Sequence, residues 1–137
     1  RDKLELKPGA LDLINSLHGK YRLCIASSSR IESVKLCLEK FGLTTKFEKL
    51  FSDSEMDRGK PFPDLFLRTS ATMNAKPGQC LVIEDSIAGM QAAKSANMRC
   101  IICPDTFCDI QRKKFAKADK VVDNLTEIAE EMIDGLA

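Results

Sequence analysis

The chain has 137 residues, of which 44% are hydrophobic, so it can form one domain with a substantial core. Its 21 Lys and Arg residues nearly balance 20 Asp and Glu residues, and a net charge of +1 excludes a basic surface for nucleic acid or an anionic membrane. No apolar run approaches the roughly 20 residues that span a bilayer, and the charged start Arg1-Asp2-Lys3 is no signal peptide. We therefore expect a cytoplasmic protein, with a single domain over residues 1–137 and a small-molecule partner.

Short apolar runs alternate with segments of helical periodicity along the whole chain. A short apolar run of strand length predicts a strand, and apolar residues three and four apart predict a helix. The predicted strands are residues 21–26, 49–52, 80–83, 99–103 and 121–122, and the predicted helices are residues 8–17, 31–41, 64–73, 86–97, 109–117 and 125–136. Because strands that alternate with helices pair in parallel, the fold class is α/β, with a parallel sheet covered by helices on both faces.

The six cysteines do not indicate a redox or metal site. Cys100 and Cys103 form a Cys-x-x-Cys sequence inside a predicted strand. Side chains three apart on a strand point to opposite faces, so this pair is poorly placed to share a metal ion or form a disulfide. Cys24, Cys37 and Cys80 also lie in apolar patterns, as reduced cysteines of intracellular proteins do.

In a parallel sheet, ligands bind beyond the carboxyl ends of the strands. Polar residues lie at three such places in this chain. Ser27 follows the first strand, and its hydroxyl and amide could donate to a phosphate oxygen, although a cap for the next helix is the simpler interpretation. Lys60 lies between Gly59 and Pro61, in a loop whose prolines suit a fixed positive charge beside a phosphoryl group. Taken alone, Lys60 is equally well a solvated loop lysine.

Two adjacent carboxylates, Glu84 and Asp85, end the apolar run of the third strand. Unpaired carboxylates are costly at the end of a buried strand, and Mg²⁺ accepts one or two carboxylates together with water and phosphate. The alternative is that Asp85 or Ser86 caps the following helix and that Glu84 is solvated. We hold these two interpretations as equal. Gly89, in the same helix, is interpreted as a position of close helix packing.

Taken together, these motifs resemble the haloacid dehalogenase superfamily, in its phosphatase and β-phosphoglucomutase-like branch. The resemblance rests on Ser27, then Gly59-Lys60-Pro61-Phe62-Pro63-Asp64, then Glu84-Asp85-Ser86 with Gly89 and Ala92-Ala93, and it covers nearly the whole chain. It implies a three-layer α/β/α, Rossmann-like core. It also implies that Ser27, with Ser28 beside it, and Lys60 bind phosphate, and that Asp85 binds Mg²⁺ with support from Glu84.

The family also has an Asp-x-Asp motif on a central strand, whose first Asp attacks phosphorus and whose second acts as acid and base. No Asp-x-Asp occurs in these 137 residues. The match begins at Leu6-Lys7-Pro8-Gly9, where the family re-enters its core after a helical cap. We therefore expect the nucleophile strand and the cap to be missing, which would leave a gap between the strands at residues 21–26 and 80–83.

The leading functional hypothesis is the core of a Mg²⁺-dependent phosphatase that acts on a small phosphorylated metabolite through an aspartyl-phosphate, with this chain inactive by itself. A sugar-phosphate mutase is the near alternative. A phospho-receiver module or a non-catalytic phosphate-binding domain is a further alternative, and a dinucleotide-binding fold is disfavoured because no Gly-x-Gly-x-x-Gly follows a strand. We also expect that a separate segment, an exchanged strand from a second copy, or re-pairing of the two flanking strands fills the gap.

Overall fold

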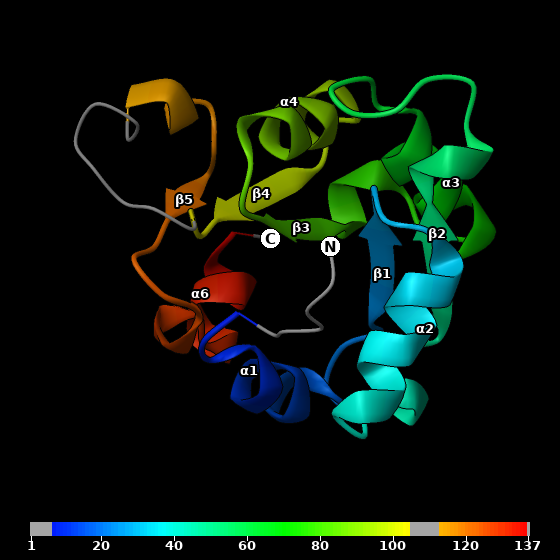
Figure 1. The fold of residues 1–137 in the computed structure, drawn as a ribbon. Coiled ribbons are helices and arrows are strands. Elements are labelled where there is room, and N and C mark those ends of the chain that lie inside the picture. Colours follow the sequence, from blue (N-terminus) through cyan, green and yellow to red (C-terminus); the bar gives the residue numbers. More distant parts are fainter. Residues whose placement is uncertain (1–6, 105–112, 137) are drawn as a thin grey trace.

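The computed structural model describes residues 7–104 and 113–136. Its strands form two parallel sheets (Figure 1). In one, β1 (Cys24–Ser27) pairs with β2 (Lys49–Ser52), and in the other β3 (Leu81–Glu84), β4 (Arg99–Ile102) and β5 (Lys120–Val121) lie in that order. Every pairing is parallel, which confirms the α/β class predicted from the alternation of strands and helices.

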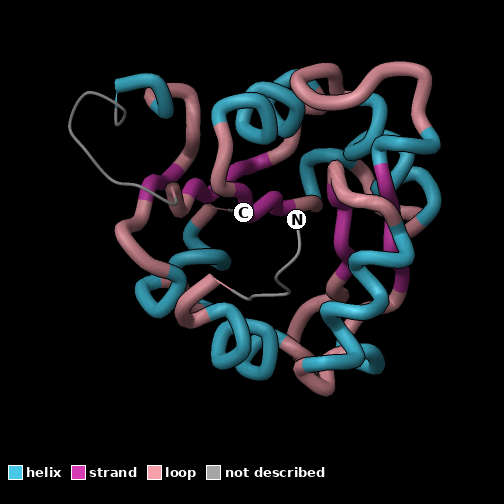
Figure 2. The backbone as a smooth tube through the Cα atoms, viewed as in Figure 1, coloured by secondary structure: helices cyan, strands magenta, loops and turns pink. Residues whose placement is uncertain are grey.

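Helices cover both faces of these sheets, as Figures 1 and 2 show. The helices are α1 (Ala10–Leu17), α2 (Ile31–Lys40), α3 (Asp64–Thr72), α4 (Ile87–Ser95) and α6 (Glu130–Gly135). One hydrophobic cluster joins Phe66 of α3 and Met90 of α4 to one face of the β3-β4-β5 sheet. A second cluster joins Leu13 and Leu17 of α1, with Ile133 of α6, to the other face. None of the helices within the described residues is both long and apolar enough to cross a membrane.

The two cysteines of the Cys-x-x-Cys sequence lie on opposite faces of the sheet, as predicted. Cys100 belongs to the cluster under α4, and Cys103 belongs to the cluster under α1. Both side chains are buried. The apolar surroundings disfavour a charged thiolate, and burial is the main reason why the pKa of Cys100 is raised to about 12.

The predicted boundaries need correction at the first helix and the first strand. The first helix begins at Ala10 instead of Pro8, because Gly9 has a left-handed backbone (φ +85°) and stands at the N-cap. The first strand begins at Cys24 instead of Tyr21. Tyr21 forms a separate bridge with His18, and its hydroxyl donates a hydrogen bond to Oδ1 of Asp134 at 2.6 Å.

The single C-terminal helix predicted over residues 125–136 is wrong. A 3-10 turn over Leu125–Glu127 is followed by extended backbone at Ile128 and Ala129, and α6 begins only at Glu130. At this break in the helix, the side chain of Ile128 is buried in the cluster under α1. Residues 109–112 of the helix predicted at residues 109–117 lie outside the described residues, and in the remainder Lys113–Phe115 forms a 3-10 turn.

A gap separates the two sheets. Within the described residues, β1 has no partner on the side away from β2, and β3 has none on the side away from β4. The two strands do not pair with each other, so the proposed direct re-pairing does not occur in this structure. A cavity of about 620 Å³ lies between them, and we call it the inter-sheet slot. The expected gap between these strands is therefore present.

Candidate functional site

The predicted site residues lie together at the carboxyl ends of β1 and β3. A pocket of about 600 Å³ is lined by Ser27 and Ser28 at the end of β1, by Lys60 from the long loop before α3, and by Glu84 and Asp85 at the end of β3. These residues are up to 58 positions apart in sequence, from Ser27 to Asp85, and they meet because parallel strands end at the same edge. The pocket is open at this edge, and we call it the strand-end pocket.

The serine loop after β1 does not cap the following helix. The N-cap of α2 is Arg30, and its side chain makes no capping hydrogen bond. Oγ of Ser27 instead accepts a hydrogen bond from the backbone N–H of Ser29 at 2.9 Å. A hydroxyl that accepts through a lone pair keeps its own proton for donation. Ser27 is therefore arranged as a hydrogen-bond donor toward the strand-end pocket.

The neighbouring hydroxyl of Ser28 is already used. Ser28 Oγ donates to Oδ2 of Asp53 at 2.9 Å, and this contact ties the loop after β1 to the 3-10 turn after β2. The fully buried Ser52 adds a second tie, because its hydroxyl donates to the backbone oxygen of Ser29 at 2.7 Å. Asp53 was not identified from the sequence, since nothing local distinguishes it from other loop carboxylates. It holds the hydroxyl of Ser28 in place, whereas the hydroxyl of Ser27 keeps its own proton.

Lys60 is an almost buried ammonium, which excludes the solvated-lysine interpretation. Its Nζ lies 2.8 Å from Oε2 of Glu84, and the two side chains are only 10% and 11% exposed. The same Nζ lies 5.4 Å from the centre of the Phe66 ring, at a distance typical of a cation–π contact. The loop that carries Lys60 is closed by Arg58, whose guanidinium bonds both carboxylate oxygens of Asp64 at the start of α3.

Glu84 is held ionised by its partners. Burial opposes the charge, but Lys60 and the backbone N–H of Asp85 outweigh it, so the pKa of Glu84 is lowered. Oε1 accepts from Asp85 N at 3.1 Å while Oε2 faces Lys60. The alternative that Glu84 is solvated is therefore wrong, and in this structure Glu84 orients Lys60.

Gly89 makes this ion pair possible. A Cβ built at Gly89 would lie 2.0 Å from Cδ of Glu84 and 2.4 Å from its Oε2. No heavy atom tolerates such distances, so any side chain at this position would displace Glu84 from Lys60. The expected role in helix packing is replaced by a role in the site. The spacing between Glu84 and Gly89 is visible in the sequence, but only the turn into α4 shows why the position must be glycine.

Asp85 stands at the mouth of the pocket, and Ser86 is the helix cap. Oγ of Ser86 accepts from the backbone N–H of Gly89 at 2.9 Å, which confirms Ser86 as one of the two capping candidates. The exposed Asp85 carboxylate is thus not needed for the helix. Across the described ranges, no cluster of three His, Cys, Asp or Glu side chains forms a ready metal cage. Mg²⁺ needs only one or two carboxylates beside water and phosphate, so Asp85 fits as one ligand.

Lys7 is a further residue of the pocket that sequence reasoning did not single out as functional. It lines the strand-end pocket together with Lys60, and its Nζ donates to the backbone oxygen of Cys103. A lysine before a helix carries no local signal of such a position. The two ammonium groups face the carboxylates of Glu84 and Asp85 in the same pocket, so positive and negative side chains balance at this end of the sheet.

Comparison with known proteins shows the family to which the chain belongs. The model of the haloacid dehalogenase-like hydrolases matches residues 1–97. The chain belongs to this family. A curated relative, the bifunctional riboflavin kinase/FMN phosphatase of Arabidopsis thaliana, is 33% identical over 129 residues, which cover 93% of this chain and 34% of that protein.

Solved structures of the family have the same fold. A haloacid dehalogenase hydrolase of family IA from Entamoeba histolytica superposes with a TM-score of 0.84 at 26% identity, over 96% of this chain and 60% of that one. CbbY from Rhodobacter sphaeroides, solved in complex with xylulose-(1,5)bisphosphate, superposes with a TM-score of 0.80 at 28% identity, over 90% of this chain and 56% of that one. The chain thus spans less than two thirds of each of these relatives.

Proposed function

We propose that this chain is the core of a Mg²⁺-dependent phosphatase that hydrolyses a small phosphate ester through an aspartyl-phosphate. The observation that carries the proposal is the meeting of Ser27, Lys60 and Asp85 in one pocket at the strand ends. A hydroxyl donor, an ammonium and an exposed carboxylate are the groups that bind a phosphoryl group and its metal ion. Membership of a hydrolase family whose relatives include phosphatases supports this chemistry.

Each residue has a distinct part in the proposed reaction. The Ser27 hydroxyl donates to one phosphate oxygen and so orients the substrate. Lys60 has three N–H donors, so it can hold Glu84 and still donate to the phosphoryl group as negative charge redistributes. Asp85 would hold Mg²⁺, which supplies positive charge against the phosphoryl oxygens. Glu84 would support that site through its hydrogen bond from the Asp85 amide.

The attacking carboxylate is not provided by an Asp-x-Asp sequence in these 137 residues. We therefore propose that the nucleophile comes from a segment outside them, and that the chain by itself does not turn over a phosphate ester. A phosphoryl pocket without a nucleophile can position its ligand but cannot form the covalent intermediate. A small phosphorylated metabolite remains the proposed substrate, and the cytoplasm the proposed location.

Turnover of p-nitrophenyl phosphate tests the assignment in the full-length protein that contains this chain. We expect Lys60→Ala and Asp85→Asn each to lower kcat/KM by about 100-fold or more, because each removes a group that acts on the developing charge. Ser27→Ala should cost less, since a neutral hydroxyl contributes less than an ion. The matched controls are Lys35→Ala and Asp12→Asn, which alter exposed residues outside the pocket. Unchanged turnover in the Lys60 or Asp85 variant would refute the site.

A sugar-phosphate mutase is the second candidate, because solved β-phosphoglucomutases share this fold over 84% and 96% of the chain. The two reactions differ in the fate of the phosphoryl group. A phosphatase releases inorganic phosphate, whereas a mutase returns the phosphoryl group to another hydroxyl of the sugar. Measuring both inorganic phosphate and the isomerised sugar phosphate from one incubation separates them.

A further inference from the structure

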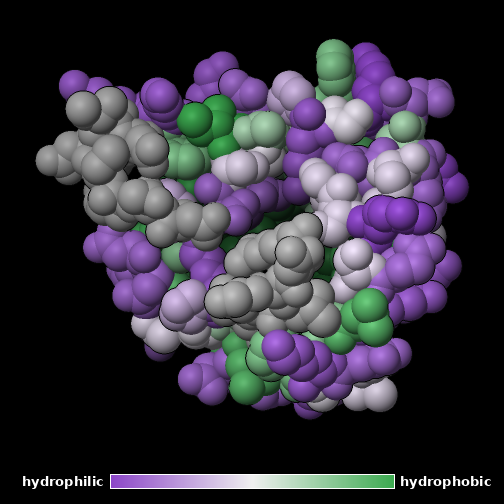
Figure 3. Space-filling model, in the orientation of Figure 1, coloured by the Kyte–Doolittle hydropathy of each residue, from purple (hydrophilic) through white to green (hydrophobic). Residues whose placement is uncertain are grey.

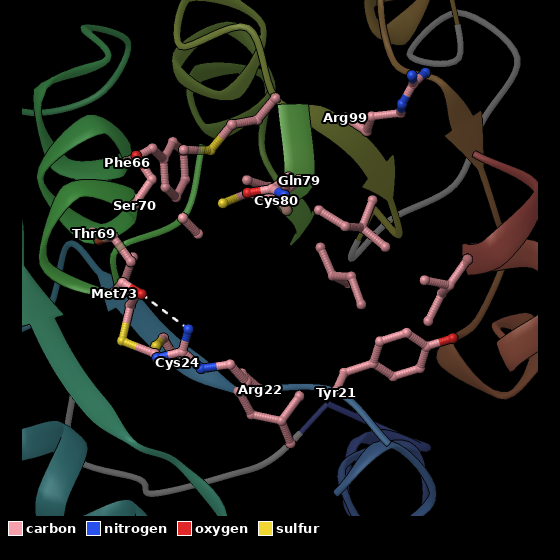
Figure 4. A pocket seen from close by; sticks show the side chains of 18 of the residues that line it. Tyr21, Arg22, Cys24, Phe66, Thr69, Ser70, Met73, Gln79, Cys80 and Arg99 are labelled. Atoms are coloured by element: carbon pink, nitrogen blue, oxygen red, sulfur yellow. Dashed lines mark hydrogen bonds between the residues drawn. The ribbon is translucent and has the colours of Figure 1, made fainter. Parts of the chain in front are cut away.

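The inter-sheet slot separates the two sheets along their strand edges. Cys24 at the start of β1 and Cys80 just before β3 lie on opposite sides of this open space (Figure 4). Figure 3 shows the molecule hollowed near the centre of the view, between the two sheets. Within the described residues, β1 and β3 form no ladder with each other. The relative position of their carboxyl ends, at Ser27 and Glu84, therefore depends in this structure on side chains and loops.

One series of contacts joins these two strand ends at the edge where the strand-end pocket lies. Ser28 Oγ donates to Oδ2 of Asp53 at 2.9 Å, which links the end of β1 to the turn after β2. The Asp53 carboxylate also packs against Gly59, because a Cβ built at Gly59 would lie 2.9 Å from the same Oδ2. Lys60 follows Gly59 directly, and its Nζ lies 2.8 Å from Oε2 of Glu84. The contacts thus run from one sheet to the other through Asp53.

The Asp53 carboxylate is not needed to cap the turn that carries it. Ser52 is the N-cap of the 3-10 turn Asp53–Glu55, and its Oγ accepts from the backbone N–H of Ser54 at 3.3 Å. The partly buried Asp53 side chain instead reaches the Ser28 hydroxyl and the backbone of Gly59. A side chain that contacts two loops in this way is placed to set the distance between them.

Asp53 lies behind the strand-end pocket and not in it. The described residues that line this pocket include Ser28 and Lys60, whereas Asp53 and Gly59, which are also described, are not among them. The carboxylate therefore stays away from the position of a phosphate in the pocket, which a further negative charge would repel. Its two contacts are with the serine loop and with the residue before Lys60, the two segments to which the proposed function assigns phosphate binding.

Gly59 is explained by this contact and not by its backbone conformation. Its φ lies outside the left-handed range that favours glycine. A Cβ at 2.9 Å from Oδ2 and 3.3 Å from Cγ of Asp53 would be too close to the carboxylate. Any side chain at this position would therefore push the Asp53 carboxylate away and weaken its hydrogen bond from Ser28.

We propose that Asp53 is a positioning residue for phosphoryl transfer, which sets the distance between the Ser27 hydroxyl and the Lys60 ammonium without touching the substrate. This role rests on the proposed function, because the distance matters only if both groups bind one phosphoryl group. A misplacement of about 1 Å can cost about 100-fold in rate. The bond from Ser52 to the backbone of Ser29 remains when Asp53 is changed, so the expected loss is smaller, about tenfold.

Turnover and inhibition of the full-length protein that contains this chain test the proposal, with p-nitrophenyl phosphate as substrate. Asp53→Ala should lower kcat/KM about tenfold. It should also raise the Ki of vanadate, which adopts the five-coordinate geometry of phosphoryl transfer, about tenfold, while the Ki of inorganic phosphate rises no more than about twofold. A smaller folded fraction alone would lower the apparent kcat and leave both Ki values unchanged. Asp57→Ala, which removes an exposed carboxylate from the same loop, is the control and should alter none of these values.

Asp53→Asn separates the position of this side chain from its charge. Asparagine has the same shape, and its side-chain oxygen can still accept from Ser28, so kcat/KM should stay within about threefold of the wild-type value. A loss as large as that of Asp53→Ala would show that the negative charge is what matters, and it would overturn the positioning role.

A double-mutant cycle tests the contact between Asp53 and Gly59. Gly59→Ala should lower kcat/KM about tenfold when Asp53 is present, because the new Cβ displaces the carboxylate. In the Asp53→Ala background the space is free, so the same change should cost less than about twofold. Gly78→Ala is the control, since a Cβ there meets no atom within 4 Å. Equal losses from Gly59→Ala in both backgrounds would show that the two residues act independently, and would overturn the proposal.

Lys60→Ala separates failure of this proposal from failure of the proposed function. If Lys60→Ala lowers kcat/KM by about 100-fold while Asp53→Ala leaves it unchanged, only the positioning role is overturned. If neither variant changes turnover, or if the wild type has none, the strand-end pocket is not the site of phosphoryl transfer. Both the proposed function and the positioning role are then wrong.

Discussion

Gly89 is a glycine beside the strand-end pocket at which a side chain has no room. It has no catalytic group, yet its missing side chain is the space into which Glu84 folds to reach Lys60. The ion pair is nearly buried, so an ammonium without its partner would remain in a poorly hydrated position. The orientation of the proposed phosphate-binding lysine thus depends on a residue that contacts neither phosphate nor metal.

Replacing Gly89 with Ala should disrupt the ion pair without changing any charge. We expect Gly89→Ala to lower the free energy of unfolding by about 2 kcal/mol or more, because Lys60 loses its partner at a nearly buried site. Gly78→Ala is the matched control, since a Cβ at Gly78 meets no atom within 4 Å and its backbone needs no glycine. Urea denaturation of the two variants measures the difference. Equal stabilities would show that Glu84 can move aside freely.

The lowered pKa of Glu84 predicts a pH dependence of stability with a definite sign. A carboxyl group whose pKa is lower when folded than when unfolded stabilises the protein above its unfolded pKa, about 4.3 for Glu. That contribution is lost as the pH falls through the folded pKa. The stability difference between wild type and Glu84→Gln should therefore be largest at neutral pH and shrink below about pH 4.

Urea denaturation across the range from about pH 7 to pH 3 measures this difference. Glu32→Gln provides the control, because Glu32 is 77% exposed and its contact with Arg30 is long, at 3.9 Å. Its stability difference from wild type should remain small and nearly constant. A difference for Glu84→Gln that grows as the pH falls would have the wrong sign and would contradict the ion pair.

Sequence reasoning brought the candidate residues together in one place but did not find their partners. Ser27, Lys60 and Asp85 could be placed together because the ends of parallel strands meet at one edge, which needs only the order of elements. The pairing of Glu84 with Lys60 could not be predicted, because it joins positions 24 apart and depends on the path of the loop before α3. The contact between Ser28 and Asp53 was missed for the same reason.

At the scale of elements, the C-terminal segment shows how tertiary contacts override helical periodicity. Asn124 caps the 3-10 turn by accepting from the Thr126 amide at 3.0 Å, and Glu127 accepts from the Asn124 amide at 2.8 Å. This capping box starts the 3-10 turn, which ends at Ile128, where the side chain is buried in the core. The turn packs on α1, where a Cβ at Gly9 would lie 3.0 Å from Cγ2 of Thr126.

Loss of the Asn124 cap should be measurable in the stability of the whole chain. We expect Asn124→Ala to cost about 1 kcal/mol, as loss of an N-cap acceptor typically does. Asn15→Ala is the control, because Asn15 is exposed within α1 and Ala favours a helix at that position. Thermal unfolding should show a lower midpoint for the first variant and an equal or higher one for the second. The reverse order would exclude a capping role.

Three of the strands were predicted closely, and the start of the first strand was not. β2 was placed at its observed bounds, and β3 and β4 within one residue, because short apolar runs flanked by polar residues mark buried parallel strands. The predicted start of β1 was three residues too early. Tyr21 is a residue type common in strands, but here its hydroxyl donates a hydrogen bond to Asp134 of α6. A contact between positions 113 apart has no trace in the local sequence.

At the scale of the molecule, two half-sheets of unequal size are joined through α3, which contacts both β1 and β2 on one side and α4 on the other. The β1-β2 half has two strands, and two strands alone are marginally stable in water. The β3-β4-β5 half has three, and it lies between the two hydrophobic clusters. The alternation of strands and helices predicted parallel sheets, whereas the position of the gap followed only from family resemblance.

The two halves should therefore open at different free energies in the chain alone. We expect the sheet-paired amides of β1 and β2 to exchange through openings that need less free energy than those of β3 and β4. Native-state hydrogen exchange in low concentrations of denaturant measures both. The amides of β4 serve as the reference, because that strand is paired on both sides. A single opening free energy for all four strands would show that the halves unfold together.

The enclosure of the inter-sheet slot also bears on solubility. Open strand edges are sites at which folded proteins join into aggregates, and most proteins shield them with charges, bulges or short strands. Here α1, α3 and α6 flank the two unpaired edges, so the edges of β1 and β3 face inward. A neighbouring folded molecule therefore cannot readily bring its own sheet alongside them. The arrangement thus discourages aggregation of folded copies through these two edges.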